Sequence, residues 1–127
     1  MLVIKVTEDR ILAQKACRDC QMEPTSGNQF AAWAQEGGRT VGCALFRLEE
    51  PLVWVDQVRA VLPDDLVLDG LIRTCLNYAV GRSINCAQFG PQVDRAVLER
   101  LYGNTGERDM ENLAYFFQNC KNCSKCR

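Results

Sequence analysis

Three consecutive strand-like segments joined by very short connections constrain the fold of this chain more than any other feature. Alternating or continuous apolar residues mark the segments 30–35 (FAAWAQ), 40–48 (TVGCALFRL) and 52–61 (LVWVDQVRAV). Gly37-Gly38 and Glu49-Glu50-Pro51 supply turn residues between them. Strands joined by such short turns must run antiparallel, so the middle of the chain forms a meander and an all-helical fold is excluded.

Helical periodicity begins directly after this meander. Apolar residues recur at helical spacing over 66–80, and a fourth strand is predicted at 84–89 (INCAQF). A helix of this length is a crossover connection, which allows the fourth strand to lie parallel to its predecessor. The sequence thus predicts a mixed sheet.

The ends of the chain add further elements to this pattern. We expect a strand at 2–6, a helix capped by Thr7 that runs to about Cys20, and a helix beginning at Pro91. The first of these helices is predicted to bury Ile11, Leu12 and Ala16, and the second to bury Val93, Ala96, Val97 and Leu101. A last helix is predicted to bury Met110, Leu113, Ala114 and Phe117. The predicted fold class is α/β (α+β), with helices flanking a mixed central sheet. A single domain over 1–119 is followed by a cysteine-rich tail over 120–127.

Composition excludes several classes of function. The 127 residues suffice for one domain, and they carry eight cysteines and no histidine. Catalytic pairs or metal sites that need histidine are therefore excluded. The net charge of −1 argues against nucleic-acid binding. Without an apolar run of roughly 18 residues or a signal-peptide core, we expect no membrane association, a cytoplasmic location and reduced or metal-bound cysteines.

Three stretches, in this order, resemble the GNAT superfamily of N-acetyltransferases. The hairpin 34–44 (AQEGGRTVGCA) resembles the family's charged-Gly turn and the strand that follows it. The segment 58–64 (VRAVLPD) is similar to the family's strand end, and 69–80 (DGLIRTCLNYAV) looks like the helix after its acetyl-CoA loop. The resemblance spans about 2–101. It implies a GNAT-like acyl-CoA N-acyltransferase fold and acyl transfer from acyl-CoA to a small-molecule or peptide amine.

The segment aligned with the family's acetyl-CoA loop departs from the family pattern. That loop has the form Arg/Gln-x-x-Gly-x-Gly/Ala and binds the pyrophosphate through backbone N–H groups. The corresponding residues here are Val61, Leu66, Val67, Leu68, Asp69 and Gly70. This segment is shorter, lacks the basic residue and carries Asp64, Asp65 and Asp69, which repel a pyrophosphate. Acetyl-CoA binding and transfer are therefore expected to be weak or lost.

The resemblance also points to two catalytic candidates. Asp56 lies on the strand that carries the family's general base, and Tyr115 is the candidate acid that protonates the leaving thiolate. Tyr102 is the other late tyrosine. The alternative is that Asp56 is an ordinary strand residue and both tyrosines are packing groups.

The cysteines fall into two groups. Cys43, Cys75 and Cys86 lie in apolar segments and are predicted core residues. The others form the doublet Cys17-x-x-Cys20 and the triplet Cys120-x-x-Cys123-x-x-Cys126, whose spacing suits zinc or an iron–sulfur cluster. A free reduced tail and a redox dithiol remain open. The alternative function is thus a non-catalytic binding or sensor module with a cysteine-ligated metal, and a homodimer is also left open.

Overall fold

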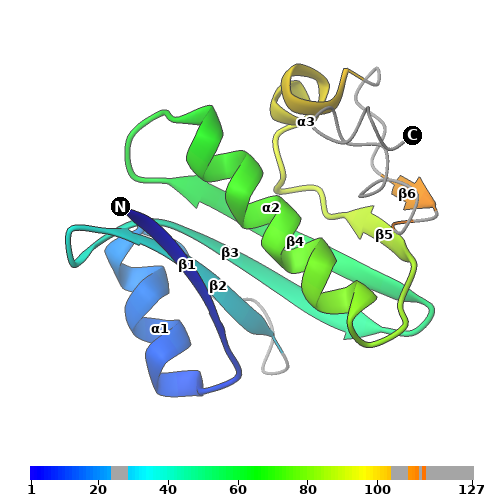
Figure 1. Ribbon diagram of the computed structural model, residues 1–127, viewed down its shortest axis with the longest axis horizontal. Helices are drawn as coiled ribbons and strands as arrows, with labels where there is room; N and C mark the ends of the chain where they lie inside the picture. The colour runs from blue at the N-terminus through cyan, green and yellow to red at the C-terminus, as the bar shows by residue number, and fades with distance from the viewer. Residues whose placement is uncertain (24–28, 104–108, 112, 114–127) are drawn as a thin grey trace.

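A single mixed sheet forms the centre of the molecule (Figure 1). The computed structural model describes residues 1–23, 29–103, 109–111 and 113. In chain order the elements are β1 (Leu2–Thr7), α1 (Arg10–Asp19), β2 (Phe30–Glu36), β3 (Arg39–Glu49), β4 (Leu52–Ala60), α2 (Asp65–Val80), β5 (Cys86–Phe89), α3 (Arg95–Tyr102) and β6 (Asp109–Glu111).

The strands follow one another across the sheet in sequence order, β1 to β6. The first four are antiparallel neighbours, and α2 returns the chain so that β5 runs parallel to β4. β6 pairs antiparallel with β5. The predicted mixed α+β sheet is confirmed, but the last predicted helix is wrong at Met110, which lies on β6 opposite Ala87. Pairing with the open edge of β5 outweighs the helical periodicity of that segment.

The turn between β2 and β3 forms as its glycines predict. Glu36 pairs with Arg39, which leaves Gly37 and Gly38 as a two-residue loop. Their φ angles of 61° and 82° lie in the left-handed region, as the hairpin turn that follows the strand twist requires. This turn sets the register of the adjoining pairs Glu36–Arg39 and Gln35–Thr40, before the register shifts at Ala34.

The face of the sheet under α2 holds the larger core. Its fully buried side chains include Phe46, Val53, Val55, Leu71 and Ile72. α2 approaches β3 closely at Gly42. A Cβ there would lie 2.7 Å from Val67 Cγ1 and 2.9 Å from Leu71 Cδ1, so only glycine permits this contact.

The opposite face is covered by α1 (Figure 1). The predicted stripe is only partly correct, because Ile11 and Leu12 are 76% and 45% exposed while Ala13, Ala16 and Cys17 are buried. The cap also differs from the prediction. Asp9, not Thr7, accepts the N–H groups of Ile11 and Leu12, at 2.9 and 3.3 Å. α1 therefore starts later than predicted, and it packs its small residues against the sheet.

The last described helix also starts later than predicted. Asp94 caps α3 by accepting from Ala96 N–H at 2.9 Å, so Pro91 lies before the helix. Leu98 is its buried residue, whereas Ala96 of the predicted stripe is exposed. Val93 is buried ahead of the helix, as an anchor for the β5–α3 connection.

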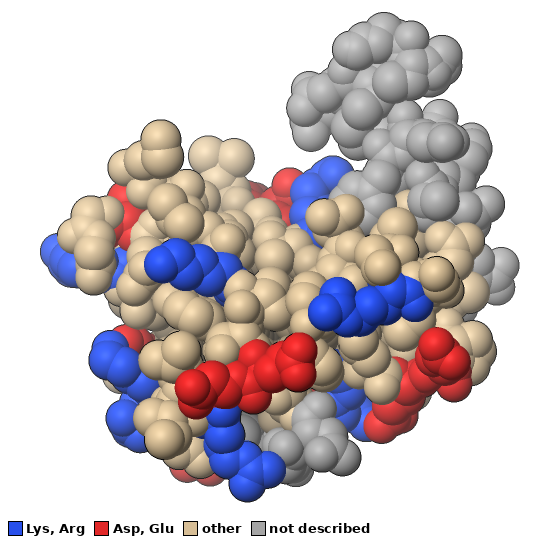
Figure 2. Space-filling view, turned by 60° about the horizontal axis from the view of Figure 1, so that its bottom comes forward, with Lys and Arg blue, Asp and Glu red and all other residues tan. Residues whose placement is uncertain are grey.

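Charged side chains of both signs share the surface. On the face drawn in Figure 2, Lys and Arg lie among Asp, Glu and uncharged residues, and the described part of this face carries no continuous basic surface. Among the helices of the described residues, none has the length and apolar character needed to cross a membrane.

Candidate functional site

The pairing of β4 with β5 ends half-way along β4. Their parallel pairing ends at Val55 opposite Phe89, whereas β4 continues to Ala60. Gly90 N–H donates to Val55 O at 2.8 Å, and the chain then leaves the sheet toward α3. A Cβ on Gly90 would lie 3.4 Å from Asp56 Cα and O, so the chain after β5 packs against β4 at Asp56.

The pairing of β3 with β4 shows which backbone groups of β4 face this opening. Val61 N–H donates to Val41 O at 2.8 Å, and Arg59 pairs with Cys43. Because successive residues of a strand direct their backbone groups to opposite sides, the N–H and C=O groups of Val58 and Ala60 point away from β3. In the described part of the chain, no strand pairs with β4 on that side beyond Val55. This free side can receive an extended ligand that carries amide groups.

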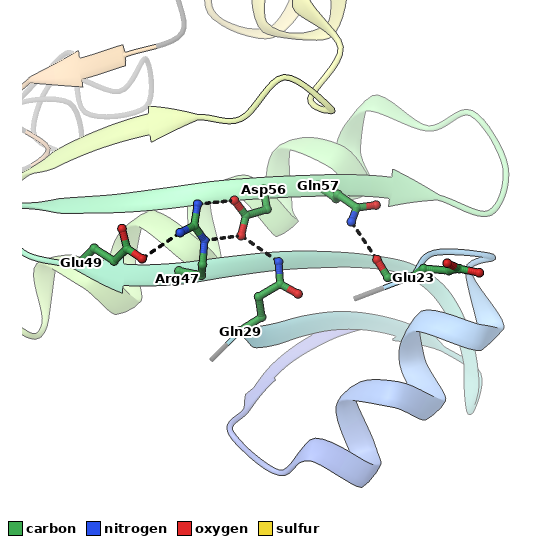
Figure 3. A network of polar contacts seen from close by, with 6 residues as sticks. All are labelled: Glu23, Gln29, Arg47, Glu49, Asp56 and Gln57. Atoms are coloured by element: carbon green, nitrogen blue, oxygen red, sulfur yellow. Dashed lines mark hydrogen bonds and ion pairs between the residues drawn. The ribbon is translucent and has the colours of Figure 1, made fainter. Parts of the chain in front are cut away.

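A β-bulge places Asp56 at the start of the free side. The register of β3 and β4 shifts between Leu45 and Phe46, which leaves Asp56 as the extra residue of β4, and its side chain lies toward Arg47 (Figure 3). Arg47 donates to both carboxylate oxygens of Asp56, at 2.8 Å from Nε and 3.0 Å from Nη2. Gln29 adds a hydrogen bond of 2.8 Å. The pair was not predicted, although Arg47 lies opposite Trp54 in the β3–β4 hairpin and Asp56 is two residues further along the same face of β4.

The chemistry of Asp56 is governed by this pairing. Its side chain is only 12% exposed, and the carboxylate raises the pKa of Arg47. Arg47 also contacts the ring of Trp54, with 5.4 Å between Cζ and the ring centroid. The second catalytic candidate, Tyr115, lies outside the described residues.

The N-terminus of α2 is occupied by the protein's own carboxylates. Asp64 caps the helix and accepts from Leu66 N–H at 2.9 Å. Asp65 forms a two-pronged ion pair with Arg100 of α3, with both distances 2.8 Å, and this pair lowers the pKa of Asp65. Two carboxylates against one guanidinium leave a net charge of −1 where the resemblance places a pyrophosphate.

The predicted cofactor residues divide by exposure. Val61 and Leu66 are 49% and 77% exposed, whereas the side chains of Val67 and Leu68 are buried. Gly70 faces β1, since a Cβ there would lie 2.8 Å from Ile4 Cδ1. None of these residues offers a cationic group to a phosphate.

Asp69, the remaining predicted cofactor residue, belongs to a polar group between α2 and α3. Its carboxylate accepts from Arg73 Nε at 2.9 Å and from Tyr102 Oη at 2.8 Å. Burial, followed by the hydrogen bond to Asp69, raises the pKa of Tyr102, so the phenol stays protonated. Its position as a late tyrosine near the end of a helix was the only sequence signal for it.

Only two of the five predicted metal ligands, Cys17 and Cys20, lie among the described residues. Cys17 and Cys20 are buried beside Cys43, at 1%, 3% and 0% exposure, while Cys120, Cys123 and Cys126 lie outside the described residues. Within the described ranges, no group of three or more Cys, His, Asp or Glu side chains is placed to hold a metal ion. Cys75 is a buried core residue as predicted, and Cys86 is half-buried.

Comparison with solved structures identifies the architecture. No protein-family model matches the sequence, and no curated protein matches it. A GNAT-family acetyltransferase from Streptococcus pneumoniae aligns with 95% of this chain and 94% of its own, at 14% identity and a TM-score of 0.58. An aminoglycoside N-acetyltransferase in complex with CoA aligns over 88% and 91%, at 10% identity and a TM-score of 0.58.

The ribosomal-protein-S18-alanine N-acetyltransferase of Escherichia coli aligns over 70% of this chain and 66% of its own length, at 10% identity and a TM-score of 0.57. The chain has the GNAT fold. This fold determines where the chain's own residues lie, through the order of the strands, the crossover through α2 and the early end of the β4–β5 pairing.

Within this GNAT fold, two of the chain's own features stand out. On the side of β4 away from β3, the described residues supply no partner strand beyond Val55, as a ligand that adds to the sheet requires. The N-terminus of α2, in contrast, is closed by the Asp64 cap and the Asp65–Arg100 pair. Of these two neighbouring surfaces, the first is therefore open and the second is occupied.

Proposed function

We propose that this chain binds an acyl thioester along the free side of β4 and transfers the acyl group to an amine, with little help from the diphosphate of acetyl-CoA. The observation that carries the proposal is the stretch of β4 beyond Val55, where Val58 and Ala60 direct backbone groups to an unpaired side. The pantetheine arm of CoA contains two amides, which can pair with such a strand. The GNAT fold, shared with a protein solved in complex with CoA, supports this choice of ligand.

The diphosphate end of the ligand meets unfavourable charge. A phosphate at the α2 N-terminus would have to displace the Asp65 carboxylate from Arg100 and would remain close to Asp64. Binding then depends on the pantetheine arm, and affinity for acetyl-CoA is weak. The acetyltransferase activity is correspondingly weak or lost.

Proton transfer is also restrained. Asp56 is the proposed base and Tyr115 the proposed acid. Arg47 and Gln29 hold the Asp56 carboxylate through three hydrogen bonds, so an amine must approach oxygens that already contact other donors. The acceptor is proposed to be a small-molecule or peptide amine, as the neighbours that act on ribosomal-protein alanine and on aminoglycosides support.

Two ligands separate the two halves of the site. Calorimetry should give dissociation constants for acetyl-CoA and S-acetyl-pantetheine within about threefold of each other, because the diphosphate contributes little. A preference of roughly 100-fold for acetyl-CoA would contradict the loss of the diphosphate site. Failure of both ligands to bind would overturn the thioester site itself.

Matched variants locate the binding surface. Ala60→Pro removes an N–H that β3 does not use and should weaken both ligands about tenfold, whereas Ala60→Val keeps the N–H and should bind normally. Asp65→Asn releases Arg100 and should strengthen binding of acetyl-CoA alone, by about fivefold at low salt. Equal effects of Asp65→Asn on both ligands would contradict the role given to the α2 N-terminus.

A cysteine-ligated zinc or iron–sulfur site in a non-catalytic module remains the alternative prediction. Metal analysis of anaerobically purified protein tests it. Metal near one equivalent that Cys123→Ser removes would support it, and metal-free protein with all eight thiols titratable would contradict it.

A further inference from the structure

Three thiols meet beneath the C-terminal end of α1. Cys17 lies in the last turn of the helix, Cys20 is its C-cap residue, and Cys43 comes from β3. All three are buried in the same cluster on the α1 face. The Cys43 thiol is the neighbour that most affects the pKa values of the Cys17 and Cys20 thiols, which places the three side chains beside one another, and Cys43 Sγ also donates to Ala44 O at 3.9 Å. Cys43 is distant from the Cys17–Cys20 doublet in the sequence, and the fold brings the three residues together.

The end of α1 holds the doublet in this position. Gln21 has a left-handed φ of 58°, Gln21 N–H donates to Arg18 O at 3.1 Å, and Met22 N–H donates back to Cys17 O at 2.8 Å. This pair of bonds is the Schellman motif, which reverses the chain at a helix end and brings the residue after the turn against the last helical turn. Cys20 and Met22 are thereby directed inward, against the strand that carries Cys43.

The cluster brings reactive sulfur groups together from two elements. Cys17 and Cys20 come from the end of α1 and Cys43 from β3, and all three lie in one buried cluster. Arg59, which donates to Gln21 O at 3.0 Å, adds positive charge near Cys20. Two thiols held beside each other in this way are the arrangement that disulfide formation requires.

We propose that this cluster is a site of reversible disulfide formation, in which Cys43 pairs with Cys17 or Cys20 and links β3 covalently to α1. The proposal does not depend on the thioester site. A hydroperoxide is the class of oxidant that fits a buried site, because hydrogen peroxide is little larger than water. The same three side chains do not form a metal site, since the described residues contain no group placed for one.

The reaction proceeds in two balanced steps. The Cys17 or Cys20 thiolate attacks one peroxide oxygen, the O–O bond breaks, and the departing oxygen takes up a proton to leave as water. The resulting sulfenic acid is attacked by the Cys43 sulfur, which forms the S–S bond and releases a second water. Overall, two thiols lose two electrons and two protons, and one hydrogen peroxide is reduced to two waters.

A disulfide here would restrain a weakly packed helix. α1 rests on alanines and cysteines, with Leu45 and Met22 as the larger buried members of the cluster. A cross-link to β3 restricts the unfolded chain and should raise the melting temperature by about 5 °C.

Peptide mapping of the full chain tests the proposal directly. Trypsin cleaves after Lys15, Arg18, Arg39 and Arg47, so the three thiols fall on the separate peptides 16–18, 19–39 and 40–47. After graded hydrogen peroxide treatment and alkylation, peptide 40–47 should be linked to 16–18 or to 19–39, and dithiothreitol should release it. The tail cysteines fall on other peptides, 109–121, 122–125 and 126–127, so their cross-links are distinguished by mass.

Variants provide the matched controls. Cys43→Ala should lose both the cross-link and the rise in melting temperature, whereas Cys75→Ala, in the core on the other face, should keep both. The peptide map of the wild-type protein tests the proposed disulfide even if Cys43→Ala is unstable. Alkylated Cys43 in oxidised, folded wild-type protein, with cross-links only within the doublet or the tail, would overturn the proposal.

Discussion

The two faces of the sheet are covered by side chains of different size and chemistry. Under α2, large aliphatic and aromatic side chains such as Phe46 and Leu71 fill a continuous core. Under α1, small alanines and three thiols occupy the equivalent depth, next to the ion pair of Arg47 and Asp56. Because burial free energy scales with apolar area, most of the folding stability resides on the α2 face. The α1 face has less stability to lose and carries the reactive groups.

The largest expected effect compares neighbours on β3 that face opposite sides. Phe46→Ala should destabilise the protein by about 3–5 kcal/mol, and Leu45→Ala by about 2–3 kcal/mol because its small neighbours can close part of the cavity. Urea unfolding monitored by circular dichroism measures both. An equal or greater loss for Leu45→Ala would contradict the unequal division between the faces.

The polar part of the α1 face provides a second test. Arg47→Met leaves the mostly buried Asp56 carboxylate without its cation and should cost about 2 kcal/mol. Glu49→Gln removes the exposed partner of the same arginine and should cost below about 0.5 kcal/mol. Unfolding free energies at pH 7 give both values. If both variants have the same stability, the Arg47–Asp56 pair does not hold this face together.

The smallest expected effect concerns the end of α1. Gln21 adopts a left-handed conformation that costs a non-glycine residue roughly 1 kcal/mol. Gln21→Gly should therefore raise the free energy of unfolding by up to about 1 kcal/mol, whereas Gln21→Val should lower it. Stabilisation by valine would show that the Schellman turn does not fix the helix end as described.

The sequence predicted the meander closely and α1 poorly, for a physical reason. Strand alternation, the Gly37-Gly38 turn and the long helix all act locally, so β2, β3, β4 and α2 were found within one or two residues of their bounds. In α1 two apolar stripes compete. Ile11 and Leu12 are the more apolar, but Ala13, Ala16 and Cys17 face the sheet. Which stripe is buried depends on the sheet, which periodicity in one segment cannot reveal.

The candidate site was predictable only in part. The acidic residues at the α2 N-terminus were visible in sequence, but their pairing with Arg100 depends on where α3 packs. The contact of Asp56 with Arg47 depends on the register of the β3–β4 hairpin, and the meeting of Cys43 with Cys17 depends on the path of the helix end. The contacts of Asp65 with Arg100 and of Cys43 with Cys17 join residues that are far apart in the sequence and share no local pattern.

Gly42 has a consequence for ligand recognition. Because Val67 and Leu71 rest almost on the β3 backbone at this glycine, the first two turns of α2 cannot slide toward or away from the sheet without leaving a void or a clash. The helix end thus acts as a fixed wall. A bulkier ligand at the proposed site would therefore gain room through the connections that flank it, such as 61–64, while α2 keeps its position.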